Sequence, residues 1–157
     1  MKIALSCLAG AALGLAALPL LGQTDPGKDV PELVVTLKGG SAQERAASAR
    51  ILGEIGREAK DAVPGLAEAL ADDERDVRQN AARALGQIGP AARPAVAPLI
   101  RSLQDKDWQV RQMAAFALGE IGDPAAKAAL EAARKDKQEP VKRAARNALK
   151  ALKKKRA

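Results

Sequence analysis

The sequence contains no histidine and no tyrosine, and Trp108 and Phe116 are its only aromatic residues. Histidine is the commonest metal ligand in proteins and the usual general base near neutral pH. Its absence excludes nucleophile systems that depend on a histidine base, and it excludes most metal sites. With so few aromatic side chains, the core must consist of alanine, leucine, valine and isoleucine. Such a core suits helices with small side chains, which pack closely side by side.

The single cysteine, Cys7, lies within residues 1–22, which have the features of a signal peptide. Lys2 supplies a short positive start, and residues 3–21 form an uncharged run rich in alanine and leucine. We predict cleavage after Gly22 and export to the periplasm or the extracellular space, which leaves a mature chain without disulfides. The alternative is an uncleaved inner-membrane anchor, because about 19 uncharged residues approach the ~20 that span a bilayer.

An internal repeat organises the rest of the chain. Residues 77–89, Val-Arg-Gln-Asn-Ala-Ala-Arg-Ala-Leu-Gly-Gln-Ile-Gly, recur 33 residues later as residues 110–122. A shorter copy precedes them at residues 51–56, and another follows at residues 141–149 with an offset of 31. A fixed period in this range is typical of a solenoid, in which each unit buries its apolar face against its neighbours.

We expect each repeat to form two helices. Residues 30–153 then make an all-α fold, a right-handed α-solenoid (superhelix) of about four helix pairs, between a linker at 23–29 and a basic tail at 154–157. The second helices of the two central repeats place apolar residues on one face at helical spacing: Val77, Ala81, Ala84, Leu85 and Ile88, then Val110, Ala114, Ala117, Leu118 and Ile121.

Local signals predict where these helices begin and end. Gly89 and Gly122 are expected to end the second helices, since glycine is common just past a helix C-terminus. Asp61 is expected to cap the first helix of the second repeat. Pro98 lies within the first helix of the third repeat and is expected to kink it.

At these residues the chain resembles the HEAT repeats, in the short form named after the phycobilisome lyases, with units like Val-Arg-x-x-Ala-Ala-x-Ala-Leu-Gly-x-Ile-Gly. The resemblance implies that the second helices line a concave binding surface. Similar proteins include bilin lyase subunits, di-iron deoxyhypusine hydroxylases and interaction scaffolds. The hydroxylases bind iron through His-Glu motifs, whereas this chain has Gly53-Glu54 and Gly119-Glu120. Because this chain departs from the family at those histidines, we expect no iron, and we expect no other cofactor. A lyase or hydroxylase activity, by family inheritance alone, is a remote alternative.

Two columns of the repeat have candidate structural roles. Arginine and aspartate recur in register, and we expect them to pair between neighbouring repeats, because a guanidinium suits a partly buried carboxylate; the alternative is a basic ladder for an anionic ligand. This structural ladder comprises Asp72, Arg78, Asp105, Arg111, Asp136 and Lys142, with Arg45 at its start. Gly53, Gly86 and Gly119 form the second column and are expected to allow close packing of helices.

The candidate binding site is an outward stripe on the second helices, opposite their apolar faces. Trp108, Gln112 and Phe116 form its centre, and the residues in register with them are Arg75, Gln79 and Arg83 on one side, Arg50 beyond, and Arg143 on the other. Trp and Arg are enriched at binding hot spots. The alternative is that Trp108 covers a helix start and Phe116 packs on a neighbouring repeat.

Charge is distributed unevenly along the chain. Residues 126–157 hold 12 Lys or Arg against 3 Asp or Glu, a net charge of +9, whereas residues 23–125 have a net charge of −3. We predict a non-catalytic scaffold that binds an acidic protein or peptide and takes no small-molecule substrate. The alternative is an adaptor held to an anionic envelope surface by its basic C-terminus. The export signal argues against nucleic acid.

Overall fold

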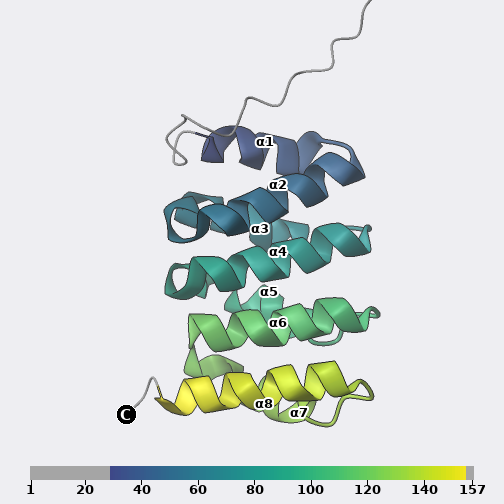
Figure 1. Ribbon diagram of the computed structural model, residues 1–157, viewed down its shortest axis with the longest axis vertical. Coiled ribbons are helices and arrows are strands. Elements are labelled where there is room, and N and C mark those ends of the chain that lie inside the picture. The colour runs from purple at the N-terminus through teal and green to yellow at the C-terminus, as the bar shows by residue number, and fades with distance from the viewer. Residues whose placement is uncertain (1–28, 155–157) are drawn as a thin grey trace, which may run out of the picture.

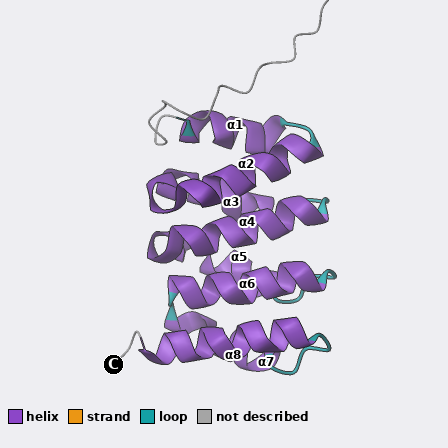
Figure 2. Cartoon of the chain, viewed as in Figure 1, coloured by secondary structure: helices purple, strands orange, loops and turns teal. Residues whose placement is uncertain are grey.

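The computed structural model describes residues 29–154. This part of the chain forms eight α-helices and three 3-10 helices, and no strand (Figures 1 and 2). The α-helices are α1 (Val30–Gly39), α2 (Ala42–Ile55), α3 (Val63–Ala69), α4 (Arg75–Ile88), α5 (Val96–Ser102), α6 (Trp108–Ile121), α7 (Lys127–Ala133) and α8 (Glu139–Lys154). The 3-10 helices are η1 (Gly56–Ala62), η2 (Gly89–Ala95) and η3 (Pro124–Ala126).

The helices form four pairs, which confirms the predicted all-α solenoid. The longer second helices α2, α4, α6 and α8 stack one above another in a single layer, and the shorter first helices α3, α5 and α7 lie behind them (Figure 1). Each second helix packs extensively on the next, whereas the first helices touch one another much less. The second helices therefore form a continuous surface, which we call the second-helix face.

The core consists of small and branched aliphatic side chains, as the composition requires. All ten apolar residues that the periodicity predicted for α4 and α6 are buried, from Val77 to Ile121. The largest fully buried side chains are leucine, isoleucine and valine, among them Leu52, Leu85 and Leu118. Burial of apolar surface on this scale is the main favourable term in folding.

Glycine lets neighbouring second helices approach closely. A Cβ atom at Gly86 would lie 3.0 Å from the Cα atom of Ala117, and one at Gly119 would lie 2.8 Å from the Cα atom of Ala148. Gly53 faces Ala84 of α4 in the same way, at 3.0 Å. The glycine column is thus a packing feature, and it sets the short distance between successive second helices.

The glycines after the second helices adopt positive φ angles. Gly89 has φ 75° and ψ −138°, and Gly56 is similar, whereas Gly122 has φ 78° and ψ 22°, which is left-handed helical geometry. The first two begin the seven-residue helices η1 and η2, but Gly122 precedes the three-residue helix η3. The shorter period before the last repeat therefore comes from a different exit from α6.

Two local expectations differ from the structure. The prediction that Asp61 caps a helix is wrong, because Asp61 lies inside η1, and α3 begins at Val63 with no side-chain cap. Pro98 was expected to kink the first helix of its repeat, but it lies in the first turn of α5. An N–H group in the first turn has no partner within the helix, so proline costs no helical hydrogen bond there. The change from 3-10 to α geometry falls at Ala95, three residues earlier.

The last repeat ends the stack with charged residues. Where α4 and α6 have buried Ala82 and Ala115, α8 has the exposed Arg146, and Lys150 replaces the buried glycine. The predicted signal peptide and nearly all of the linker and tail lie outside the described residues. Within residues 29–154, none of the helices has both the length and the apolar character needed to cross a bilayer.

Candidate functional site

The predicted arginine and aspartate columns lie together at one end of the second helices. Each arginine pairs through two nitrogens with the aspartate that precedes the second helix of the next repeat. The Nε–Oδ2 distances are 2.7 Å for Arg45 to Asp72, 2.8 Å for Arg78 to Asp105 and 2.7 Å for Arg111 to Asp136. Each aspartate also accepts a backbone N–H two residues on, which fixes its turn.

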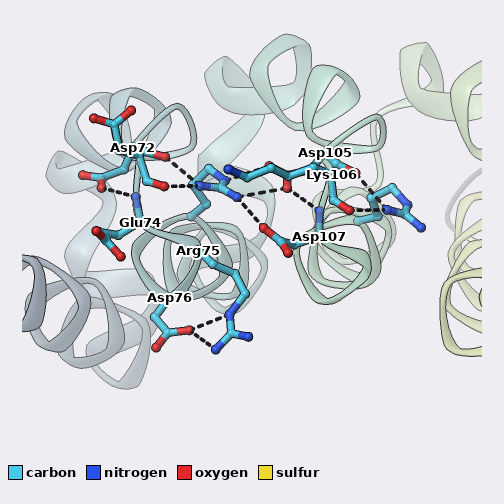
Figure 3. Close-up of polar contacts among 10 residues, drawn as sticks. Asp72, Glu74, Arg75, Asp76, Asp105, Lys106 and Asp107 are labelled. Carbon is cyan, nitrogen blue, oxygen red and sulfur yellow. Dashed lines mark hydrogen bonds and ion pairs between the residues drawn. The ribbon is translucent and has the colours of Figure 1, made fainter.

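Arg78 occupies the centre of this ladder and is the most fully bonded member. Its side chain is 6% exposed, and it also donates to Asp107 at 2.8 Å and to the backbone carbonyls of Asp72 and Asp73 (Figure 3). The hydrogen bond to Asp105 raises the pKa of Arg78, although burial opposes the shift. These bonds occupy all five guanidinium donors of Arg78, so this arginine ties neighbouring repeats together and has no donor left for an anion.

The ladder ends at α8. Lys142 pairs with Glu139 of its own helix, at 3.2 Å, and so does not continue the pattern between repeats. No further repeat among the described residues supplies an aspartate for it. Lys142 therefore occupies the same position of the repeat as the ladder arginines, but the prediction that it pairs with a neighbouring repeat is wrong.

The ladder predicts how stability depends on pH. Hydrogen bonds from Arg45 and Arg111 hold the pKa values of Asp72 and Asp136 below their ordinary value. A carboxyl with a lowered folded-state pKa stabilises the fold above its unfolded pKa and loses that contribution on acidification. The melting temperature should fall as the pH drops below about 4 and stay nearly constant between about pH 5 and 9, because the repeats contain no histidine.

Thermal unfolding followed by circular dichroism across this pH range measures the effect. Asp136→Asn is the informative variant, because it should be less stable at neutral pH and lose less stability on acidification. A stability step between about pH 6 and 8 would contradict this account, since no group in the repeats has its reference pKa there.

Both aromatic side chains lie on the second-helix face and are partly exposed. Trp108 is the first residue of α6 and is 36% exposed, and Phe116, two turns later, is 38% exposed. Phe116 also packs on the neighbouring repeat, because a Cβ atom at Gly86 of α4 would lie 2.8 Å from its ring. The two alternatives for Phe116 thus coexist: one part of the ring contacts α4, and the remainder faces solvent.

The cations of the stripe differ in their pairing. Arg50 donates to Glu54 one turn later at 2.6 Å, and Arg75 pairs with Asp76 at 2.8 Å (Figure 3). Arg83 and Arg143 are exposed, and neither forms an ion pair with any other residue in the range 29–154. Two of the four predicted arginines therefore keep their full charge available to a partner.

Two grooves run between the second helices. The α2–α4 groove has a volume of about 540 Å³ and is lined by Ala42, Gln43, Ala46, Ala47, Arg50, Glu74, Asp76, Gln79 and Asn80. The α6–α8 groove has a volume of about 280 Å³ and is lined by Gln112, Met113, Phe116, Gly119, Glu120, Pro140, Arg143, Ala144, Asn147, Ala148 and Ala151. The α6–α8 groove alone of these two has an aromatic wall.

The stripe predicted from helical geometry is thus divided in space. Gln112, Phe116 and Arg143 line the α6–α8 groove, and Arg50 and Gln79 line the α2–α4 groove. Trp108, Arg75 and Arg83 line neither. Sequence reasoning missed Met113 and Ala144, which face the α6–α8 groove one position beyond Gln112 and Arg143. Their register was readable from the repeat, but the groove itself depends on the spacing between two helices.

A sequence profile of HEAT repeats matches residues 30–99 and 91–150. The chain belongs to the HEAT-repeat family. The two matched segments overlap and together cover every helix from α1 to most of α8. No protein of curated function matches the chain in sequence.

Solved structures of several repeat proteins are similar to this HEAT-repeat chain. Human deoxyhypusine hydroxylase in complex with glycerol is 31% identical with a TM-score of 0.65, over 80% of this chain and 44% of that one. The complex of CpcE and CpcF of phycocyanin lyase from Nostoc sp. PCC7120 is 24% identical with a TM-score of 0.67, over 76% and 79%. A designed armadillo repeat protein in complex with the peptide (KR)4 is 20% identical with a TM-score of 0.66, over 80% and 69%.

The chain spans less than two thirds of the length of the engineered proteins that it also matches. The similarity to the phycocyanin lyase complex, at 24% identity, shows a shared fold alone. Of the relatives above, two are enzymes by name and one is a peptide-binding scaffold, so the fold alone assigns no chemistry. Among residues 29–154, no three potential ligands of the His, Cys, Asp or Glu type are grouped as a metal site requires.

Proposed function

We propose that this HEAT-repeat protein is a non-catalytic scaffold that binds a partner protein or peptide on its second-helix face. The observation that carries the proposal is the position of both partly exposed aromatic side chains on this face, beside Arg83 and Arg143, two cations that form no ion pair within residues 29–154. Aromatic and arginine side chains dominate binding energies at protein interfaces. The resemblance to the HEAT repeats supports this choice, because it implies that the second helices line a concave binding surface.

The mechanism is recognition by a surface that exists before the partner arrives. Close packing at Gly86 and Gly119, together with the arginine–aspartate ladder, holds successive second helices at a constant spacing. A rigid surface loses little conformational entropy on binding, so many modest contacts can add up to a useful affinity.

The partner's charge follows from the cations on this face. The similar armadillo structure was solved with a basic peptide, (KR)4. Here the exposed charged side chains on α4 and α8 that form no ion pair with a residue in the range 29–154 are cations, among them Arg83 and Arg143, and we therefore assign an acidic partner to this chain. Two similar proteins are enzymes by name, but the lack of histidine removes the usual bases and metal ligands, which supports a role without catalysis.

Export is part of the proposal. The charged start at Lys2 and the apolar run over residues 3–21 support a signal peptide, and the partner is then a protein of the cell envelope or the medium. The mass of the protein recovered from the envelope or medium tests this, because cleavage after Gly22 leaves Gln23 as the first residue. A protein that keeps its N-terminus and sediments with the inner membrane would favour an anchor instead.

Site-specific crosslinking tests the binding face. A photoreactive phenylalanine analogue at Gln112, on the second-helix face, should capture the partner in intact cells, whereas the same analogue at the exposed Ala97 of α5 should not. The double variant Trp108→Ala/Phe116→Ala, checked for unchanged helical content, should lose capture. The captured protein is then purified and shown to bind the unmodified chain. Equal capture at both positions, or capture that persists in the double variant, would contradict the proposal.

A second candidate function is supported by the basic end of the solenoid. Exposed cations accumulate on and beside α7 and α8, and several of them form no ion pair with another described residue: Lys127, Lys135, Lys137, Arg143, Lys150, Lys153 and Lys154. Such a surface could hold the protein to anionic lipid or wall polymer. Deleting residues 153–157 removes the C-terminal part of this surface and should weaken that attachment, as salt should too, and should leave partner capture unchanged.

A further inference from the structure

The α6–α8 groove has a chemistry that narrows the class of partner. One wall carries the half-exposed ring of Phe116 with Met113, the floor is formed by Gly119 and Ala148, and the α8 wall presents Arg143. The amide side chains of Gln112 and Asn147 lie between them. Side-chain amides can donate to and accept from a peptide backbone, while the ring and thioether suit one apolar side chain.

The groove's length sets the size of the bound segment. Its lining on α8 runs from Pro140 to Ala151. At 1.5 Å per helical residue this is about 16 Å, the length of about five residues of extended peptide. The groove is therefore long enough for an apolar residue and its immediate neighbours on both sides.

The charges along the groove are asymmetric. Arg143 and Asn147 line the α8 wall, and Lys150 follows them on the same face of α8 at i, i+4 and i+7 spacing, beside the lining residue Ala151 at the end of the groove. Neither Arg143 nor Lys150 forms an ion pair with a described residue, and Lys153 and Lys154 continue the basic surface. Glu120 is the one carboxylate in the lining, and it lies on the α6 side. Acidic side chains of a partner therefore belong on the α8 wall.

The α2–α4 groove lacks these features. It has no aromatic wall, its Arg50 already pairs with Glu54, and its lining includes the carboxylates of Glu74 and Asp76. The larger groove is therefore the poorer match for an acidic apolar segment, although it belongs to the same face.

We propose that the α6–α8 groove is the specificity site of this protein and binds an extended acidic peptide segment of about five residues, with one apolar side chain against Phe116 and carboxylates along Arg143 and Lys150 of α8. This proposal rests on the proposed function, and it assigns the main anchor to Phe116 and a minor role to Trp108.

The probe is a fluorescein-labelled, C-terminally amidated peptide whose central leucine is flanked on each side by two glutamates. Amidation removes the terminal carboxylate, and every peptide carries the same anionic label, so differences in affinity between the peptides report their side chains. Comparison peptides carry glutamine or lysine in place of glutamate, or alanine in place of leucine. Fluorescence anisotropy with the protein as the cell produces it gives each affinity. The glutamate peptide should bind at least about tenfold more tightly than each comparison peptide.

Matched variants locate the binding. Phe116→Ala and Arg143→Glu should each weaken binding of the glutamate peptide at least about tenfold. Val35→Ala removes another exposed apolar side chain, and Arg50→Glu makes the same charge change on α2. Val35→Ala should change the affinity less than about twofold, whereas Arg50→Glu and Trp108→Ala should each weaken it clearly less than Arg143→Glu and Phe116→Ala do. Circular dichroism confirms that every variant is folded.

The outcomes separate this proposal from the proposed function. Equal weakening by Arg50→Glu and Arg143→Glu overturns the α6–α8 assignment and leaves the second-helix face as a binding surface. Loss of binding on deletion of residues 153–157, with no effect of Phe116→Ala, identifies simple attraction to the basic end and overturns it as well. If the glutamate peptide binds no more tightly than the glutamine and lysine peptides, the proposal of an acidic segment is overturned. Crosslinking at Gln112 still decides the proposed function.

Discussion

Replacing Arg78 with alanine is expected to lower the free energy of unfolding by about 3 kcal/mol, as when one partner of a buried ion pair is removed. The side chain is 6% exposed and makes bidentate contact with Asp105. Its removal leaves that carboxylate, which is only 11% exposed, beside the carboxylate of Asp107 without a cation between them. The backbone carbonyls of Asp72 and Asp73 lose their donor as well.

Urea unfolding followed by far-UV circular dichroism measures this loss. Arg83→Ala is the matched control, because it removes an exposed cation from the same helix and should cost less than about 0.5 kcal/mol. Arg78→Lys should lie between the two, since an ammonium keeps the charge but cannot make the forked contact. Similar stabilities for Arg78→Ala and Arg83→Ala would show that the ladder contributes nothing to the fold.

Replacing Gly119 with alanine is expected to cost about 2 kcal/mol, the range found when atoms are forced into a well-packed interior. The added Cβ atom would lie 2.8 Å from the Cα atom and 2.9 Å from the Cβ atom of Ala148 on α8. A backbone atom cannot rotate away as a long side chain can, so α6 and α8 must move apart.

Gly39→Ala is the control for the intrinsic preference of the two residues. Gly39 is the last residue of α1, and a Cβ atom there would meet nothing within 4 Å. Alanine at this position should leave stability unchanged or raise it by about 0.5 kcal/mol, because it restricts the unfolded chain. Thermal and urea unfolding of both variants give the comparison. A stable Gly119→Ala protein with an unaltered α6–α8 spacing would contradict the packing role of the glycine column.

These two sites link the stability of the solenoid to its surface. In a repeat protein each unit contacts only its neighbours, so the interfaces between repeats hold the structure together. The ladder and the glycine column both lie at those interfaces, and Gly119 also lines the α6–α8 groove. A change that separates α6 from α8 should therefore alter binding in the groove even though it touches no exposed side chain.

The architecture could be predicted from the sequence because the motif that specifies one helix pair recurs several times along the chain. A period of 33 residues and an apolar spacing typical of helices determine which faces are buried, and every predicted core residue of α4 and α6 is buried. The register of arginine and aspartate likewise indicated the pairing between repeats. Caps and turns were harder: Asp61 is a suitable capping residue, but η1 continues through its position and no helix begins there.

The candidate site was only partly predictable. Helical geometry predicted one outward stripe for Trp108 and Phe116, because the direction of a side chain follows from its position in the helix, and both side chains are partly exposed. It could not show that Arg50 and Arg75 pair with nearby carboxylates, while Arg143 forms no ion pair with any residue that the structure describes. Such pairings depend on rotamers and on neighbours that a single helix does not specify.

The sequence by itself determined the repeat, the helix pairs, the buried faces and the uneven charge of this protein, since these follow from residue type and spacing along the chain. Only the tertiary structure decided that Phe116 and not Trp108 borders a groove, and that the α6–α8 and α2–α4 grooves differ in chemistry. The physical reason is that a groove belongs to two helices at once. Its width depends on how closely their backbones approach, and its charge depends on which of its side chains already form ion pairs within the fold.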